Sequence, residues 1–116
     1  MQCLTFLQTL LTMEAMAEYT EAARSRVASG DTEHQSVLIE AERIEELLST
    51  GTLVIEPAPV PGHLTEAVRR FSSRIRARIE AGETVLKETL DEVEAVQRHL
   101  DAGEIRIDPA AIATAA

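Results

Sequence analysis

Apolar side chains recur at helical spacing along most of the chain. From Gln2 or Leu4 to Ser29 they fall three or four positions apart, and the pattern ends at Gly30. It resumes over 37–48 and ends at Gly51. Such spacing is typical of amphipathic helices that bury one face. We therefore expect a helical hairpin that turns at Gly30, with Thr32 and Gln35 at the spacing of a capping box for the second helix.

The second half of the chain has the same pattern over 64–79 and 86–100. The apolar positions stay in phase through Gly82, so one long helix over 64–102 is an alternative. We favour a break, because a glycine inside a helix costs about 1 kcal/mol relative to alanine. A glycine followed by an acidic residue and a threonine stands at both Gly30 and Gly82, which indicates a shared turn.

Two short segments are predicted to be extended. Leu53-Val54-Ile55 is rich in β-branched residues, and Ile105-Arg106-Ile107 alternates apolar and polar positions as a half-buried strand does. Between the halves lies the proline-rich segment 57–62, which is expected to be a stiff, extended linker.

The two halves also match each other residue by residue. A shift of 52 positions aligns 14–58 with 66–110 without a gap, and the identical pairs include Arg24/Arg76, Arg26/Arg78, Gly30/Gly82 and Gly51/Gly103. A repeat of this kind sets the architecture. We expect one mainly α domain over 1–116, built of units 1–58 and 59–110 with a tail at 111–116. The tandem-duplicated hairpins should form a pseudo-twofold four-helix bundle, and the two extended segments should pair as a small antiparallel ribbon.

Composition narrows the class of protein. The chain has 116 residues, of which 45% are hydrophobic and only 3% aromatic, so its core must be aliphatic. A single cysteine, Cys3, excludes an internal disulfide and fits a reducing compartment, so we expect a cytoplasmic protein. The net charge of −9 argues against a general nucleic-acid binder and fits either a soluble protein or one with a basic partner.

Recognisable catalytic or cofactor motifs are absent from the sequence. It has no nucleophile elbow, phosphate loop or dinucleotide fingerprint. His34, His63 and His99 lack the spacing of metal ligands, and no Glu-x-x-His pair is present. The apolar N-terminus is too short and too polar to span a membrane and makes a poor signal peptide. We therefore expect a protein that is not an enzyme and that binds neither cofactor nor metal.

The first candidate binding surface is the apolar N-terminal segment. It has no counterpart in the second unit, so its side chains either contact a partner or a second copy, or cap the core; they are Leu4, Phe6, Leu7, Leu10 and Leu11.

The second candidate surface is a recurring pair of arginines on the first helix of each unit. Acidic Glu-x-Glu pairs recur at 40–42 and 92–94 on the second helix, so ion pairs within each hairpin are the simplest interpretation. Partner docking is the alternative role for the four arginines: Arg24, Arg26, Arg76 and Arg78. The first helix of the second unit carries a denser basic run, in which Arg69, Arg70 and Arg74 precede Arg76 and Arg78. We expect this run to be balanced by acids of a neighbouring helix.

Two segments resemble known families. Ala28-Ser29-Gly30-Asp31 followed by residues 38–43 resembles the middle of small flagellar export chaperones, which implies an acidic helical hairpin that sheathes an apolar helix of a secreted subunit. The order of 53–56, helix 64–81, Gly82 and helix 83–102 resembles ribbon-helix-helix antitoxins, which implies dimerisation through the strand and DNA reading by its polar face.

Together these patterns favour a non-enzymatic, acidic adaptor, chaperone or assembly protein that offers an apolar helical face to a protein partner or to a second copy as a homodimer. A small transcriptional regulator or antitoxin is the first alternative. A structural component of a larger assembly, such as a phage particle, is the second.

Overall fold

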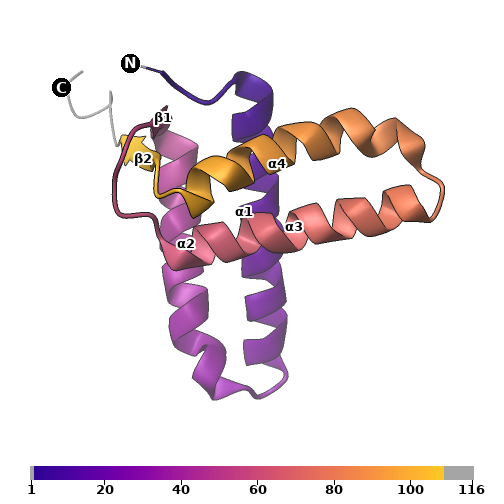
Figure 1. Cartoon of the computed structure of the whole chain (residues 1–116). Coiled ribbons are helices and arrows are strands. Elements are labelled where there is room, and N and C mark those ends of the chain that lie inside the picture. Colours follow the sequence, from indigo (N-terminus) through magenta and orange to yellow (C-terminus); the bar gives the residue numbers. More distant parts are fainter. Residues whose placement is uncertain (1, 109–116) are drawn as a thin grey trace.

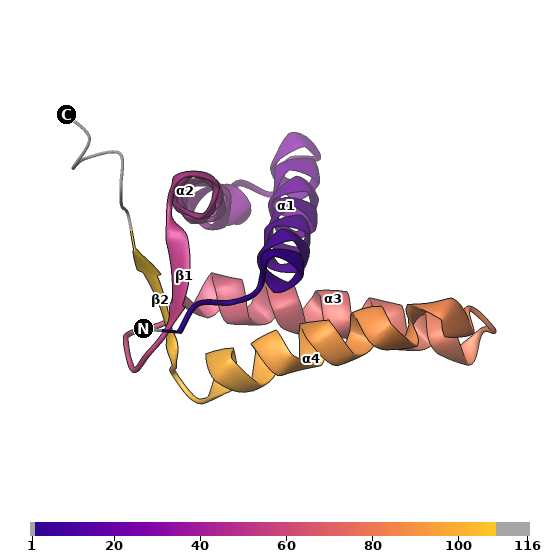
Figure 2. The same cartoon turned by 90° about the horizontal axis from the view of Figure 1, so that it is seen from above.

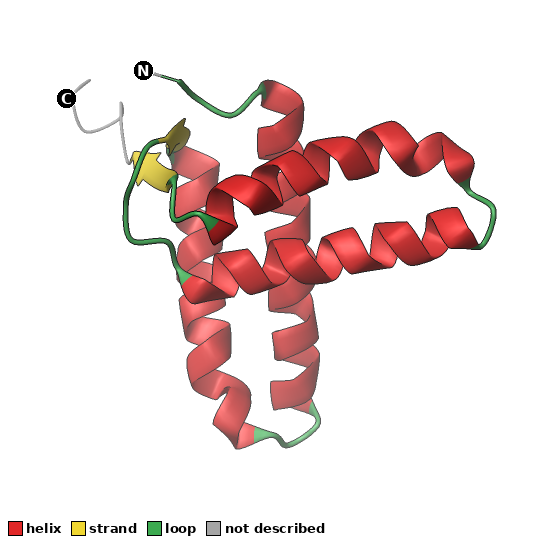
Figure 3. Cartoon of the chain, in the orientation of Figure 1, coloured by secondary structure: helices red, strands yellow, loops and turns green. Residues whose placement is uncertain are grey.

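Four helices make up most of the computed structural model, which describes residues 2–108 (Figures 1 and 3). The mainly α fold predicted from the sequence is confirmed, and so is the small ribbon. The predicted tail at 111–116 lies outside the described residues. The elements are α1 (Phe6–Ala28), α2 (Gln35–Thr50), β1 (Thr52–Ile55), α3 (Gly62–Glu80), α4 (Lys87–Asp101) and β2 (Ile105–Asp108).

Both hairpins turn at the predicted glycines. Gly30 has φ 106° and Gly82 has φ 116°, a region that side chains with a Cβ rarely adopt. The N–H of Asp31 donates to the carbonyl of Arg26 at 3.0 Å, and Glu83 donates to Arg78 at the same distance. The turn at Gly30 is thus built like the turn at Gly82, and the alternative of one long helix over 64–102 is wrong.

The predicted capping box at Thr32 and Gln35 is wrong. Thr32 begins a single 3-10 turn, and the residue before α2 makes no side-chain cap. A capping box closes the start of α1 instead, where the N–H of Gln8 donates to Oγ1 of Thr5 and the N–H of Thr5 donates to Oε1 of Gln8, both at 3.1 Å. The 3-10 turn satisfies backbone groups that the predicted cap would have satisfied.

The hairpins form two layers that cross (Figures 1 and 2). Hairpin α1–α2 packs across hairpin α3–α4, and the core lies between them. Met16 of α1, Leu64 of α3 and Val93 of α4 are almost fully buried there. The core is aliphatic, as the composition predicts, with Phe71 as its one buried aromatic side chain.

The strands pair as a symmetric antiparallel ribbon. Leu53 faces Ile107 and Ile55 faces Ile105, with Val54 opposite Arg106 at the centre. Residues 53 and 105 are equivalent in the two halves, as are residues 55 and 107. Replacing each residue by its equivalent turns the pair Leu53–Ile107 into the pair Ile105–Ile55, so the register has pseudo-twofold symmetry. Leu53 and Ile105 are buried in the core shared by the two hairpins, which anchors the ribbon to the helices.

The N-terminal segment adds a third, short extended piece to this ribbon. Leu4 donates from its N–H to the carbonyl of Leu53 at 3.0 Å, and Ile55 donates to the carbonyl of Gln2 at 2.7 Å. The helix predicted from Gln2 or Leu4 therefore begins only at Phe6. β1 then has β2 on one side and residues 2–4 on the other.

We expect Gly51→Ala to lower the free energy of unfolding by about 1–3 kcal/mol, as overpacking typically does. A Cβ at residue 51 would lie 2.7 Å from the carbonyl oxygen of Asp108 and 2.8 Å from that of Leu47, and neither backbone atom can move without disturbing β2 or α2. Gly62→Ala is the control, because its Cβ would meet open space; it should change stability by less than about 0.5 kcal/mol. Urea unfolding of both variants measures the difference, and equal midpoints would contradict it.

Candidate interaction surface

The five apolar N-terminal side chains divide between the core and the surface. Leu4 and Leu11 are 7% and 9% exposed and belong to the core. Phe6, Leu7 and Leu10 are 79%, 51% and 45% exposed. We call these three residues the apolar patch. The two roles considered from the sequence, capping the core and facing outward, are thus taken by different residues of the same segment.

The patch is exposed because α1 is longer than α3 at its start. Shifted by 52 positions, the first residue of α3 corresponds to Leu10, so the turn that holds Phe6 and Leu7 has no counterpart in the second hairpin. No helix of the other layer covers its outer face. Apolar side chains that gather on a surface typically mark a binding site, whereas single exposed ones do not.

A shallow groove between α1 and α2 continues from the patch. Its apolar part is formed by Met13 and Ala17 of α1 with Leu48 of α2, and its volume is about 290 Å³. Glu14 of α1 and Glu45 of α2 also line it. Within residues 2–108, neither of these glutamates forms an ion pair or a side-chain hydrogen bond. We call this feature the α1–α2 groove.

The recurring arginines lie in ion pairs within their own hairpins. Arg24 contacts Glu42 at 3.4 Å and also Glu21, and Arg76 contacts Glu94, its counterpart pair 52 positions later. These are the pairs between helices that the sequence suggests. Their side chains stay about half exposed, so solvent screens the attraction and each pair adds little to stability.

The second arginine of each unit pairs across the turn. Arg26 lies 3.3 Å from Asp31, and Arg78 lies 2.7 Å from Glu83. The hydrogen bond from Arg78 lowers the pKa of the Glu83 carboxyl, and the same bond raises the pKa of Arg78. A role of these arginines in partner docking stays a prediction.

The basic run of α3 is balanced by acids of neighbouring helices, as expected, but also by an acid of α3 itself. Arg69 contacts Glu66 at 3.0 Å and Asp101 at 3.3 Å. Arg70 also contacts Glu66 at 3.0 Å, and Arg74 pairs with Glu18 of α1. The positive charge of this helix is therefore compensated within the chain.

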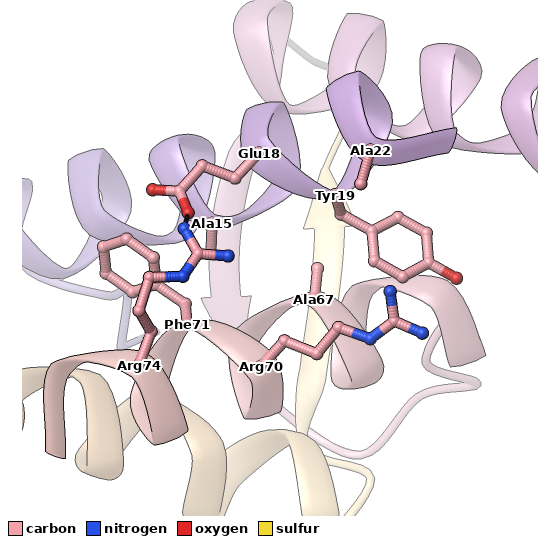
Figure 4. Close-up of a pocket in the computed structure, with 8 residues that line it drawn as sticks. All are labelled: Ala15, Glu18, Tyr19, Ala22, Ala67, Arg70, Phe71 and Arg74. Atoms are coloured by element: carbon pink, nitrogen blue, oxygen red, sulfur yellow. Dashed lines mark ion pairs between the residues drawn. The ribbon is translucent and has the colours of Figure 1, made fainter. Parts of the chain in front are cut away.

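A small pocket of about 50 Å³ lies where α1 crosses α3 (Figure 4). Ala15 and Ala67 allow the two helices to approach closely here, and Arg74 reaches across to Glu18 beside them. Arg70 lies over the ring of Tyr19, with its guanidinium carbon 5.0 Å from the ring centre. The pocket is too small for anything larger than water, because ligand sites are typically several hundred cubic ångströms.

Next to this pocket, three polar side chains join three helices. The hydroxyl of Tyr19 lies 2.7 Å from Nδ1 of His63, and Nε2 of His63 lies 2.8 Å from Glu40. With its proton on Nε2, the imidazole donates to Glu40 and accepts from Tyr19. A phenol is protonated at neutral pH and can donate, and burial raises the pKa of Tyr19 further above its ordinary value of 10.0. The chain of contacts fastens the start of α3 to α1 and α2.

Sequence reasoning missed this Tyr19–His63–Glu40 contact. Tyr19 and His63 are 44 positions apart, and no motif links them. Only the crossing of the hairpins brings them together.

The described part of the chain offers no metal site, since no three His, Cys, Asp or Glu side chains of residues 2–108 gather to hold an ion. Among the helices of the same residues, none is both long and apolar enough to cross a bilayer.

No protein-family model, curated protein or solved structure matches the chain. The features of its own surface that bear on function are the apolar patch and the α1–α2 groove.

We expect the phenol of Tyr19 to titrate at a higher pH in the folded than in the urea-unfolded protein. Its pKa is raised above 10.0, first by burial, so its share of the stability is full below pH 10 and is lost as the pH rises through the folded pKa. Tyr19 is the only tyrosine and tryptophan is absent, so ultraviolet absorbance reports this one group.

The control is Tyr19→Phe, which should flatten the loss of stability above pH 10. The substitution should also cost about 0.5–1.5 kcal/mol at neutral pH, because it leaves Nδ1 of His63 without its donor. The same titration midpoint in folded and unfolded protein would contradict the assignment.

Proposed function

We propose that this chain is a non-enzymatic protein-binding module, an adaptor, chaperone or assembly protein, that contacts its partner through the apolar patch. The observation that carries the proposal is the exposure of Phe6, Leu7 and Leu10 together on one turn of α1. A phenylalanine that is 79% exposed on an ordered helix contributes almost nothing to the core of its own chain. Its burial against another protein would remove much of that apolar surface from water.

The charge distribution supports a protein partner over a nucleic acid. The net charge is −9, and the arginines of α3 that would contact phosphates are engaged by carboxylates of the same chain. Binding to DNA gains its affinity by neutralising phosphates, for which exposed and uncompensated cations are needed. The single cysteine fits a reducing compartment such as the cytoplasm.

One observation favours the regulator as a second candidate. β1 precedes two helices joined at Gly82 and pairs antiparallel with β2, which is the order of a ribbon-helix-helix unit. The ribbon, however, carries Glu56 and Asp108 on either side of Arg106, and both carboxylates lie within ion-pair distance of it. We therefore rank DNA reading below protein binding.

The test replaces Phe6, Leu7 and Leu10 together by serine. Because these side chains lie outside the core, the melting temperature should stay within a few degrees of the wild-type value. Association should be lost. Association with a second copy is measured by light scattering over a concentration series. Association with another protein is measured by in-cell crosslinking from a photoreactive residue at the exposed position 14, which is placed in both the wild type and the variant.

Leu11→Ala is the matched control from the same segment. Leu11 is buried, so this change should lower stability by about 2–5 kcal/mol and leave association intact where the protein remains folded. Identical masses and identical crosslinking for the wild type and the triple-serine variant would refute the proposal. Binding of duplex DNA that weakens with salt would favour the regulator instead.

A further inference from the structure

The two hairpins differ chemically at one pair of equivalent places. In the first hairpin the α1–α2 groove is lined by Met13, Ala17 and Leu48. The positions 52 residues later, between α3 and α4, hold Thr65, Arg69 and Leu100. An apolar groove in one unit therefore corresponds to a polar surface in the other.

The second hairpin also has a hollow between its helices, of about 240 Å³, but its lining is polar and includes Arg69 and Gln97. Arg69, which replaces Ala17, lies 3.0 Å from Glu66 and 3.3 Å from Asp101. Gln97, which replaces Glu45, donates to the same oxygen of Asp101 at 2.9 Å. The arginine thus connects α3 to α4, and both carboxylates beside it have a partner.

The first hairpin lacks these polar contacts at the equivalent place. Ala17 has no side chain that could reach across, and Glu14 and Glu45 stand on the two sides of the groove without a cation. Glu14 is the counterpart of Glu66, which does have its arginine. The α1–α2 groove therefore combines an apolar part with two uncompensated carboxylates.

The groove is continuous with the apolar patch. Phe6, Leu10, Met13 and Ala17 follow one another at steps of four, three and four residues, which places them on one face of α1. At 1.5 Å per residue this apolar stripe is about 16 Å long, or three helical turns. A stripe of this length beside a second helix suits an amphipathic helix laid along it.

We propose that the patch and the α1–α2 groove together bind one amphipathic helix of a partner protein, with apolar residues at helical spacing and Lys or Arg beside them. This rests on the proposed function and specifies the partner. The apolar face of that helix covers Phe6, Leu10 and Met13, and its cations reach Glu14 and Glu45. A second copy is a poor fit, because residues 2–13, which form its own apolar segment, contain no charged side chain.

The experiment measures binding of a fluorescein-labelled helical peptide made of leucine and lysine, with leucines on one face, to the full chain by fluorescence anisotropy. Ala17→Arg should weaken binding about tenfold, because the new side chain would pair with Glu14 as Arg69 pairs with Glu66, and would place a cation in the apolar part of the groove. Glu14→Gln with Glu45→Gln should weaken it about threefold and reduce its salt dependence.

Glu88→Gln with Glu92→Gln is the matched control. It changes the net charge by the same amount on α4, where neither glutamate has an ion pair with another described residue, and should leave binding within about twofold. Melting temperatures by circular dichroism confirm that all variants are folded. Met13→Thr, which copies Thr65 of the second hairpin, gives a milder second test of the groove.

Equal binding of the peptide by the wild type, Ala17→Arg and the groove glutamine variant would overturn the inference. A loss of binding in the α4 control as large as in the groove glutamine variant would also overturn it, because it would show that net charge alone attracts the peptide. Lack of peptide binding by the wild type, or association only between copies, would also overturn it. If the triple-serine variant of the patch loses its association while the groove variants bind the peptide like the wild type, the proposed function stands and the groove inference falls. If neither set has an effect, both fall.

Discussion

Each helical hairpin of this chain has one apolar face, and only the other hairpin is available to cover it. That mutual burial is the interaction on which the remaining structure depends. Met16 from the first hairpin and Leu64 and Val93 from the second are removed from water together, and neither hairpin would retain this burial alone. The ion pairs between helices are about half exposed, so each contributes little to stability. The fold is therefore stabilised mainly by apolar packing.

The ribbon turns this packing into a specific arrangement. Because Leu53 and Ile105 contribute to the same core, a slip of one residue in the register would move both side chains to the opposite face. Gly51 also helps to fix the position of β2, because the end of this strand approaches it too closely for residue 51 to carry a side chain. The N-terminal segment then adds to the free side of β1, and this addition makes the first hairpin unlike the second.

The sequence predicted the local features of the fold well, because they depend on local physics. Helical spacing located the four helices, and the positive φ at Gly30 and Gly82 explains why the turns lie there. The start of α1 was less predictable, since Leu4 continues the helical pattern yet forms backbone hydrogen bonds with β1. Periodicity identifies apolar residues but does not say whether another element will compete for their backbone.

The candidate surface was predictable only in part, for the same reason. The sequence indicated the five apolar N-terminal residues as a group, but which of them face the core depends on how the hairpins cross. Leu11 is buried in the core between the hairpins. Phe6 lies before residue 10, the position that corresponds to the first residue of α3, so the second hairpin has no counterpart for it. The contact of Tyr19 with His63 likewise follows from the crossing and from no motif.

The two hairpins have matching helices and glycine turns, so the differences between them are features that the fold does not require. The α3–α4 hairpin forms the same antiparallel pair of helices and the same turn with Thr65 and Arg69 where the first hairpin has Met13 and Ala17. An apolar groove at this place is therefore not needed to build the hairpin. Ion pairs such as those of the second hairpin would keep this surface polar, whereas exposed apolar side chains favour association with another molecule. The exposed apolar stripe of the first hairpin, and the carboxylates of Glu14 and Glu45 that have no ion pair within residues 2–108, are the features that support the proposed contact with a partner helix.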